Sequence, residues 1–531
     1  MRSRPLRAAR RRRLFCPDAE QIEARRLLAA SAADVLTYHN DNARTGQDLD
    51  ETILNPSNVN SSDFGMKFTD AVDGAIYAQP LYMAGVTIPG QGVHNVVFVA
   101  TEHDSVYAFD ADKPGPPLWH DSFINPAQGV TTVPSTQPWQ SDLSPEVGIT
   151  GTPVIDPTTG TLYVAAKTET ITPAGPVDAY TLHALDVSTG AEKFGGPVLV
   201  HPTVAGRGVG SVKGKVSFQA EFQLQRPALL LENGVVYLAF GSLGDHGPYH
   251  GWVVGYAANS LAQVAVFNDT PNSRLGGIWM DGDGPAADAD GNIYLLTGNA
   301  PFSPARRGGS YGDAALKLTP SLQVADYFAP QGTVHLLKKD LDLGSGGEIL
   351  VPTQPGGAPS LLLGGGKDGT LYAVKIASMG HQRKKNPNVQ AIVNPSDPIF
   401  STPAYYNGNV YISAYGDVLR QYKIENGKLV GPVAVSSETF GYPGANLSIS
   451  ADGSSDGIVW SLENSGSRTV PGAAVLHAYN AANVGQELYN SNQAGTRDQP
   501  GNAVKFAVPT IGNGKVYVGT QTGLTVYGLL H

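Results

Sequence analysis

The amino-acid sequence predicts an all-β fold, an eight-bladed β-propeller, on three observations: a repeated unit, a four-strand pattern inside each unit, and two incomplete chain ends. A run of alternating β-branched and aromatic residues returns eight times along the 531 residues. Gly, Asn and Asp turns separate the runs, which is typical of strands rather than helices. Self-similarity at a spacing of about 60 residues indicates a stacked or radial repeat architecture. The eight runs centre on Phe98, Tyr163, Tyr237, Tyr294, Leu362, Tyr411, Trp460 and Tyr517.

Each unit divides into four short strands. In the second unit these are residues 151–156, 161–166, 180–187 and 192–200. A proline recurs at the start of the first strand in six units. Because proline has no N–H to donate, it suits a strand start or the inner edge of a propeller blade. These prolines are Pro80, Pro153, Pro227, Pro285, Pro403 and Pro509.

The two ends of the chain predict how the ring closes. The last unit supplies only three strands before His531, whereas residues 66–72 form a strand with no partner before it. Pairing this strand with the C-terminal sheet would close the ring and leave only short, protected edges. We therefore expect one propeller over residues 66–531, preceded by an N-terminal extension over residues 35–65.

Charge and composition exclude some partners. The net charge is −10, and nine of the arginines lie within the first 26 residues, so the remaining chain is more acidic still. An acidic body argues against binding of nucleic acid or of an anionic membrane surface. No apolar run approaches the roughly 20 residues that span a bilayer, so we expect no integral membrane segment.

Residues 1–34 are expected to be a basic targeting segment outside the fold. The stretch EARRLLA at residues 23–29 resembles the LEPR-xLL type of N-terminal segment of large exported proteins in planctomycete-like bacteria. This resemblance implies export to the periplasm, cell surface or exterior; a basic N-terminus without a targeting role is the alternative. Cys16 is the only cysteine, so the expected propeller has no thiol nucleophile and no cysteine-bound metal.

The repeats resemble those of the quinoprotein alcohol dehydrogenase-like propellers, named after pyrroloquinoline quinone (PQQ). The resemblance rests on DSVYAFDAD at 104–112, YTLHALDVSTGAEKF at 180–194, KDGTLYAV at 367–374 and VLHAYNAAN at 475–483. It implies the propeller fold but not an activity, because these repeats serve both dehydrogenases and non-catalytic scaffolds. The chain lacks the adjacent cysteines and the CxxCH haem motif of many alcohol-oxidising members.

The dehydrogenase activity that the resemblance allows would need PQQ, Ca²⁺, an Asp base and an Arg that polarises the quinone. Calcium prefers several oxygen ligands. Residues before the first strands should converge on the mouth of the central channel, so we take candidates from there. Asp281 is the candidate base and Glu146 and Asn446 are candidate calcium ligands. The candidate cofactor site consists of Glu146, Arg226, Trp279 and Asn446. Turn hydrogen bonds and buried ion pairs between blades are competing structural roles for these residues.

Two hypotheses for function follow. The first is an exported, non-catalytic propeller that binds a protein or a polysaccharide on one face. The second is a PQQ- and calcium-dependent dehydrogenase that oxidises an alcohol or a sugar. The sequence favours the first, because the repeats are intact whereas the thiol and haem features are missing.

Overall fold

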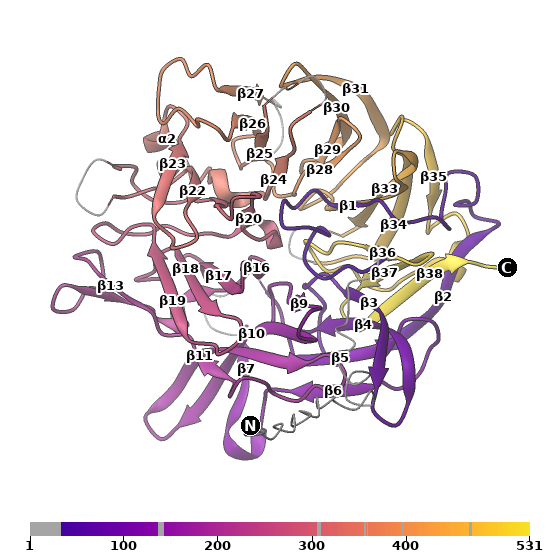
Figure 1. The fold of residues 1–531 in the computed structure, drawn as a ribbon, viewed down its shortest axis with the longest axis horizontal. Helices are drawn as coiled ribbons and strands as arrows, with labels where there is room; N and C mark the ends of the chain where they lie inside the picture. Colours follow the sequence, from indigo (N-terminus) through magenta and orange to yellow (C-terminus); the bar gives the residue numbers. More distant parts are fainter. Residues whose placement is uncertain are drawn as a thin grey trace, which may run out of the picture.

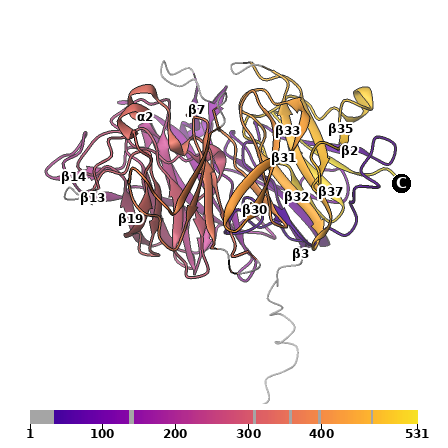
Figure 2. The same cartoon turned by 90° about the horizontal axis from the view of Figure 1, so that it is seen from above.

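The computed structural model describes residues 33–135, 143–304, 309–354, 357, 359–393, 398–466 and 470–531. Residues 1–32, which hold most of the expected targeting segment, lie outside this part of the chain. The described chain forms eight β-sheets arranged as the blades of a propeller (Figure 1). Figure 2 shows the same ring from the side. The fold class predicted from the repeats is confirmed.

Blades 1 to 4 follow one another along the chain, each with its first strand innermost. Blade 1 contains β3 (Leu81–Ile88), β4 (Gly92–Ala100), β5 (Ser105–Asp110) and β6 (Trp119–Ser122). Blade 2 contains β9 (Val154–Asp156), β10 (Thr161–Thr172), β11 (Gly175–Asp186) and β12 (Val198–Leu199), and the hairpin β7 (Val130–Pro134) and β8 (Glu146–Val147) extends it. Blade 3 contains β16 (Leu230–Glu232), β17 (Val235–Ser242), β18 (Trp252–Ala257) and β19 (Gln263–Asn268), with β15 (Gln223–Leu224) beside β17. Blade 4 contains β20 (Ala286–Ala287), β21 (Ile293–Leu296), β22 (Ala315–Leu318) and β23 (Val324–Phe328).

Blades 5 to 8 repeat this order. Blade 5 contains β24 (Glu348–Val351), β25 (Leu361–Gly365), β26 (Thr370–Lys375) and β27 (Val389–Val393). Blade 6 contains β28 (Ala404–Tyr406), β29 (Asn409–Ser413), β30 (Val418–Glu425) and β31 (Lys428–Thr439). Blade 7 contains β32 (Leu447–Asp452), β33 (Ser455–Asn464), β34 (Ala474–Asn480) and β35 (Glu487–Asn490), with β1 (Gln47–Asp48) beside β32. Blade 8 contains β36 (Thr510–Gly512), β37 (Lys515–Gly519), β38 (Gly523–Leu529) and β2 (Phe64–Ala71).

Small elements decorate the ring. The hairpin β13 (Thr203–Ala205) and β14 (Lys215–Ser217) follows blade 2, and the α-helix α2 (Thr333–Lys339) follows blade 4. No helix in the described part of the chain is both long and apolar enough to cross a membrane. The 3-10 turns are η1 (Pro126–Gln128), η2 (Ala220–Phe222), η3 (Met280–Gly282), η4 (Leu343–Ser345) and η5 (Gly495–Asp498).

The ring closes as predicted. Strand β2 pairs antiparallel with β38, from Phe64 opposite Leu529 to Ala71 opposite Gly523, and so becomes the outer strand of blade 8 (Figure 1). The first-strand prolines also lie where the sequence placed them, since five of the six directly precede an inner strand. Strand closure and the proline positions were therefore both predicted correctly from the sequence.

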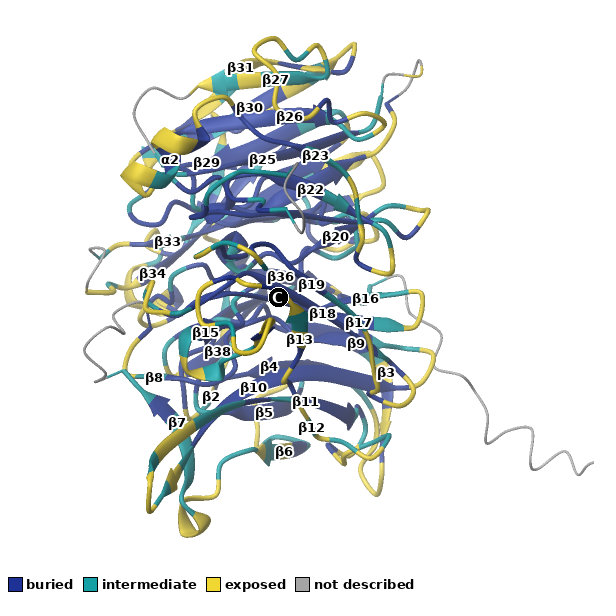
Figure 3. Cartoon of the chain, turned by 90° about the vertical axis from the view of Figure 1, so that its left-hand side faces the viewer, coloured by how far each residue is buried: buried dark blue, intermediate teal, exposed yellow. Residues whose placement is uncertain are grey.

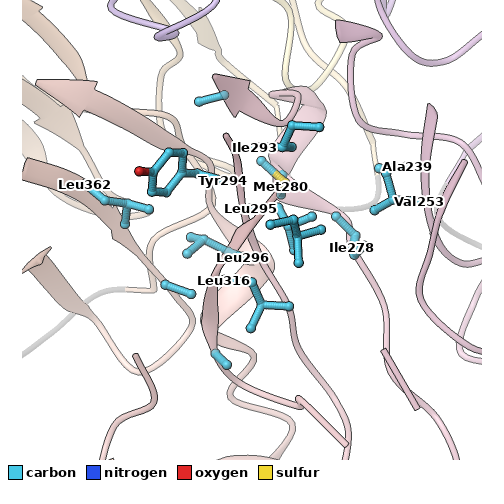
Figure 4. Close-up of a cluster of buried hydrophobic side chains, with 14 of the residues drawn as sticks. Ala239, Val253, Ile278, Met280, Ile293, Tyr294, Leu295, Leu296, Leu316 and Leu362 are labelled. Carbon is cyan, nitrogen blue, oxygen red and sulfur yellow. The ribbon is translucent and has the colours of Figure 1, made fainter. Parts of the chain in front are cut away.

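Most strand residues of the blades are buried (Figure 3), and their apolar side chains form clusters shared by neighbouring blades. A cluster from blades 3, 4 and 5 includes Ile278, Met280, Tyr294, Leu295 and Leu362, all almost inaccessible to solvent (Figure 4). Alternate residues of each strand point to opposite faces, so every blade contributes to the core on both of its sides. Burial of each such side chain stabilises the fold by about 1.5–3 kcal/mol.

The N-terminal extension lies against the inner strands of the ring. Its main chain exchanges hydrogen bonds with six blades, and the Asn42 and Glu51 side chains bond to blades 3 and 8. The inner edge of each blade would otherwise present unpaired N–H groups. The extension thus links all eight blades. The main-chain bonds join Val35 with Tyr82, Leu36 with Ile155, Asn42 with Ala287, Ala43 with Leu350, Thr45 with Tyr405, and Gly46 with Ile449.

Arg44 fixes the extension to blades 3 and 4. Its side chain is fully buried. The guanidinium donates to the Leu229 carbonyl at 3.1 Å and to the Pro285 carbonyl at 3.1 Å. It also donates to Thr37 Oγ1 at 2.7 Å and to the Tyr38 carbonyl at 3.0 Å, within the extension itself. One cation therefore satisfies acceptors from three separate segments of the chain.

Candidate functional site

The loops that lead into the inner strands meet at one end of the central channel, which we call the mouth. Arg226 precedes blade 3 and Asp281 precedes blade 4, and their side chains approach to 3.6 Å between Nη2 and Oδ1. Arg226 also lies 3.7 Å from the ring centroid of Phe506, which precedes blade 8. This cation–π contact joins blades that are far apart in the sequence. The convergence that the sequence predicted at the mouth is therefore present for Arg226 and Asp281.

Asp281 is enclosed. Its side chain is fully buried, and neither carboxylate oxygen has a hydrogen-bond partner among the described residues. Burial raises the pKa of Asp281 well above its usual value and outweighs the opposing charge of Arg226. Burial therefore favours the neutral form of Asp281, against the attraction of Arg226.

Asn446 joins the same group of side chains, but both ends of its amide are occupied. Asn446 Oδ1 accepts a hydrogen bond from the Thr402 backbone N–H at 3.0 Å, and Nδ2 donates to the Phe506 carbonyl at 3.0 Å. The amide thus ties blades 6, 7 and 8 together. This arrangement is the structural role that competed with calcium binding in the sequence.

Trp279 and Glu146 have other partners. Trp279 Nε1 donates to the Ser242 carbonyl at 3.1 Å. The Trp279 ring lies so close to Gly241 and Gly277 that a Cβ on either would come within 2.6 or 2.3 Å of it. Glu146 is in β8, where it accepts from His103 Nδ1 at 3.0 Å and from Thr132 Oγ1 at 2.7 Å. No hydrogen bond or ion pair joins the side chains of Trp279 or Glu146 to those of Arg226, Asp281 or Asn446 in the described part.

A second pair of buried acids lies beside Arg44. Asp283 Oδ2 accepts from the Glu348 backbone N–H at 2.8 Å, and neither Glu348 carboxylate oxygen has a described hydrogen-bond partner. Burial raises the pKa of Asp283 to about 8 despite the opposing charge of Arg44. Burial and the neighbouring Asp283 raise the pKa of Glu348 well above its usual value. Neither Arg44 nor Phe506 was among the residues predicted from the sequence.

The described residues show no preformed cluster of acids for a calcium ion at the mouth. No group of three or more carboxylate, imidazole or thiol side chains in the described ranges is placed to hold a metal. The oxygens of the two candidate ligands are held by His103 and Thr132 at Glu146, and by Thr402 at Asn446. The small pocket beside Asn446 and Phe506, which Leu462 and Asn464 also line, has a volume of about 10 Å³ and admits about one water molecule.

Comparisons with known proteins agree with the architecture. No protein-family model and no curated protein matches the chain. Solved structures do: a quinohemoprotein alcohol dehydrogenase from Pseudomonas putida HK5 is 13% identical, with a TM-score of 0.57 over 94% of this chain and 80% of that chain. This chain therefore shares the propeller fold of that structure.

Two more structures support this quinoprotein-like fold. The quinohemoprotein alcohol dehydrogenase from Comamonas testosteroni is 16% identical, with a TM-score of 0.57 over 97% of this chain and 82% of that chain. A europium-containing methanol dehydrogenase is 14% identical, with a TM-score of 0.59 over 96% of this chain and 100% of that one. At these identities the likeness concerns the fold alone. The resemblance of the repeats is thereby confirmed at the level of architecture.

Glu102, in the loop after β4, makes the stability of the propeller depend on pH. Its side chain is 1% exposed, and burial raises its pKa to about 7. The folded state therefore keeps a proton that the unfolded chain releases near pH 4.3. This contribution to stability is complete below pH 4.3 and is lost as pH rises through about 7.

We expect Glu102→Gln to stabilise the protein at pH 8 by about 3 kcal/mol and to flatten its pH dependence between pH 5 and 8. The glutamine oxygen can still accept the 2.8 Å hydrogen bond from the Gly148 N–H. Thermal unfolding at several pH values measures this. If the stability of the variant depended on pH as that of the wild type does, Glu102 would not be the source of the pH dependence. Glu146→Gln is the matched control, because Glu146 is also an acid near the mouth but is partly exposed.

Proposed function

We propose that this protein is an exported, non-catalytic propeller that binds a ligand at the mouth side of the ring. The burial of Asp281 is the main support. A general base must come within hydrogen-bond reach of the proton that it removes. Asp281 is fully buried, so a substrate proton cannot come within reach of its carboxylate in this arrangement.

The other mouth residues make contacts between blades, which is a structural role and not a catalytic one. Arg226 lies on Phe506, and the Asn446 amide connects the Thr402 and Phe506 main chains. Export is proposed from the resemblance at residues 23–29 and from the absence of cysteine after Cys16. A cysteine-free body is compatible with an oxidising compartment.

The alternative is a PQQ- and calcium-dependent dehydrogenase. Two observations favour it: the structural likeness to proteins described as alcohol and methanol dehydrogenases, and the two oxygens of Asp281, neither of which accepts a hydrogen bond from a described residue. Bound PQQ would supply the two-electron acceptor for alcohol oxidation. The hydrogen bonds that Glu146 and Asn446 already accept from other residues argue against this dehydrogenase hypothesis.

Calorimetric titration of the full chain with PQQ and Ca²⁺ separates the two functions. We expect no heat of binding, and no reduction of an artificial dye acceptor with a panel of alcohols and sugars. Arg226→Ala should then lower the thermal stability, because it removes the partner of Asp281 and the contact with Phe506. Calcium-dependent PQQ binding that Arg226→Ala abolishes, with the melting temperature unchanged, would establish the dehydrogenase instead.

A further inference from the structure

Four aromatic rings gather on the mouth side of blades 6 to 8, where three of them surround the fourth; we call this group the aromatic row, and it consists of Phe400, Tyr415, Tyr442 and Phe506. Tyr442 is at its centre. Its ring centroid lies 5.4 Å from that of Phe400, 5.5 Å from that of Tyr415 and 6.4 Å from that of Phe506, each in edge-to-face geometry. Tyr415 is 38% exposed, whereas Tyr442 and Phe506 are buried. The row therefore leads from the surface of blade 6 to the mouth.

The loops that carry these rings are fixed to one another by main-chain bonds. The Tyr415 N–H donates to the Pro398 carbonyl at 3.0 Å, and the Gly416 N–H donates to the Phe440 carbonyl at 2.9 Å. Gly444 has a φ of 103°, and a Cβ there would lie 2.7 Å from the Ser413 carbonyl oxygen. Such a pre-ordered surface loses little entropy on binding a ligand.

The inner end of the aromatic row is positively charged. The Arg226 guanidinium lies 3.7 Å and Lys505 Nζ 5.6 Å from the Phe506 ring centroid. Arg226 Nε has no hydrogen-bond partner among the described residues. Arg226 Nη2 lies 3.6 Å from the nearest acid oxygen, Asp281 Oδ1, and burial of that carboxyl opposes its charged form. A local cationic end is notable in a chain with a net charge of −10.

We propose that the aromatic row binds an acidic polysaccharide, with sugar rings on Tyr415 and Phe400 and a sugar carboxylate directed toward Arg226. The axial C–H groups of a pyranose form an apolar face that packs on an aromatic ring, and the phenol hydroxyl can bond to sugar hydroxyls. A carboxylate and a guanidinium form strong charge-assisted hydrogen bonds. This inference rests on the proposed binding function and names its ligand class.

The experiment is affinity electrophoresis and calorimetry of the full chain with alginate and, for comparison, the neutral polysaccharide dextran. We expect binding of alginate, weakened by added salt, and none of dextran. Tyr415→Ala should weaken alginate binding roughly tenfold, since an exposed ring that stacks on a ligand contributes on this order. Tyr415→Phe keeps the ring and should retain binding within about threefold. The exposure of Tyr415 allows both variants to fold, which melting curves check.

A second pair of variants tests the charge. Arg226→Gln should reduce alginate binding, whereas Arg207→Gln, which removes an exposed arginine of the β13–β14 hairpin loop, should not. Failure of the wild type to bind alginate, equal binding of dextran, or an unchanged affinity in Tyr415→Ala would each overturn the inference. Capture of a protein partner without any polysaccharide binding would overturn it too, yet would leave the binding function standing. PQQ-dependent dye reduction would instead refute the binding function itself.

Discussion

Deletion of residues 1–51 is expected to prevent folding of the whole propeller, although none of the removed residues belongs to the four main strands of a blade. The deletion removes the main-chain partners of inner strands in six blades, together with Arg44 and the Glu51 carboxylate that accepts from the Gly514 N–H. Unpaired inner edges are open to association with other chains. We therefore expect aggregation or loss of cooperative melting, measured by size-exclusion chromatography and circular dichroism.

Two further deletions serve as comparisons for the deletion of residues 1–51. Removal of residues 1–73 also removes β2, the outer strand of blade 8, and should be at least as damaging. Removal of residues 1–32 leaves every described residue in place and should leave melting unchanged. If the proposed export is right, this short deletion also keeps the folded protein inside the cell, and its secretion would contradict export. A monomeric, cooperatively melting chain without residues 1–51 would show that the ring closes unaided.

The fold could be predicted because each blade is local in the sequence. The period-two alternation, the turn residues and the prolines before inner strands all act within a few residues of one another. Closure by β2 could also be predicted, because a strand without a partner lies near one end of the chain and a sheet that lacks its fourth strand lies at the other. The role of the N-terminal extension could not be predicted, because the extension pairs mainly through backbone groups, and these leave no pattern of side chains in the sequence.

The candidate site was predicted in part for the same reason. Arg226, Asp281 and Asn446 lie shortly before inner strands, so the ring brings them to one end. Glu146 does not follow this rule, because the hairpin of β7 and β8 holds it beside His103. Phe506 was missed because an aromatic residue before a strand is usually a core residue. Its contact with Arg226 depends on ring closure and cannot be seen in any local window.

Arg44→Met should lower the free energy of unfolding by about 3–5 kcal/mol, the usual cost of removing one partner from a buried charged network. Methionine has a similar length but no donors. The Leu229, Pro285 and Tyr38 carbonyls would lose their hydrogen bonds in a site closed to water. The acids Asp283 and Glu348 would also lose the cation that opposes their raised pKa values. Denaturant unfolding and thermal melting measure the change.

Two comparison variants show which property of Arg44 matters. Arg44→Lys keeps the charge but has a single ammonium in place of the planar fork, so it cannot reach acceptors from the extension, blade 3 and blade 4 together. We expect it to recover only part of the lost stability. Arg207→Met removes an exposed arginine and should change stability by no more than about 0.5 kcal/mol. If Arg44→Met were as mild as Arg207→Met, the extension would be held by its backbone alone. If Arg44→Lys were fully stable, charge near Asp283 would matter more than the hydrogen bonds that join the extension to the ring.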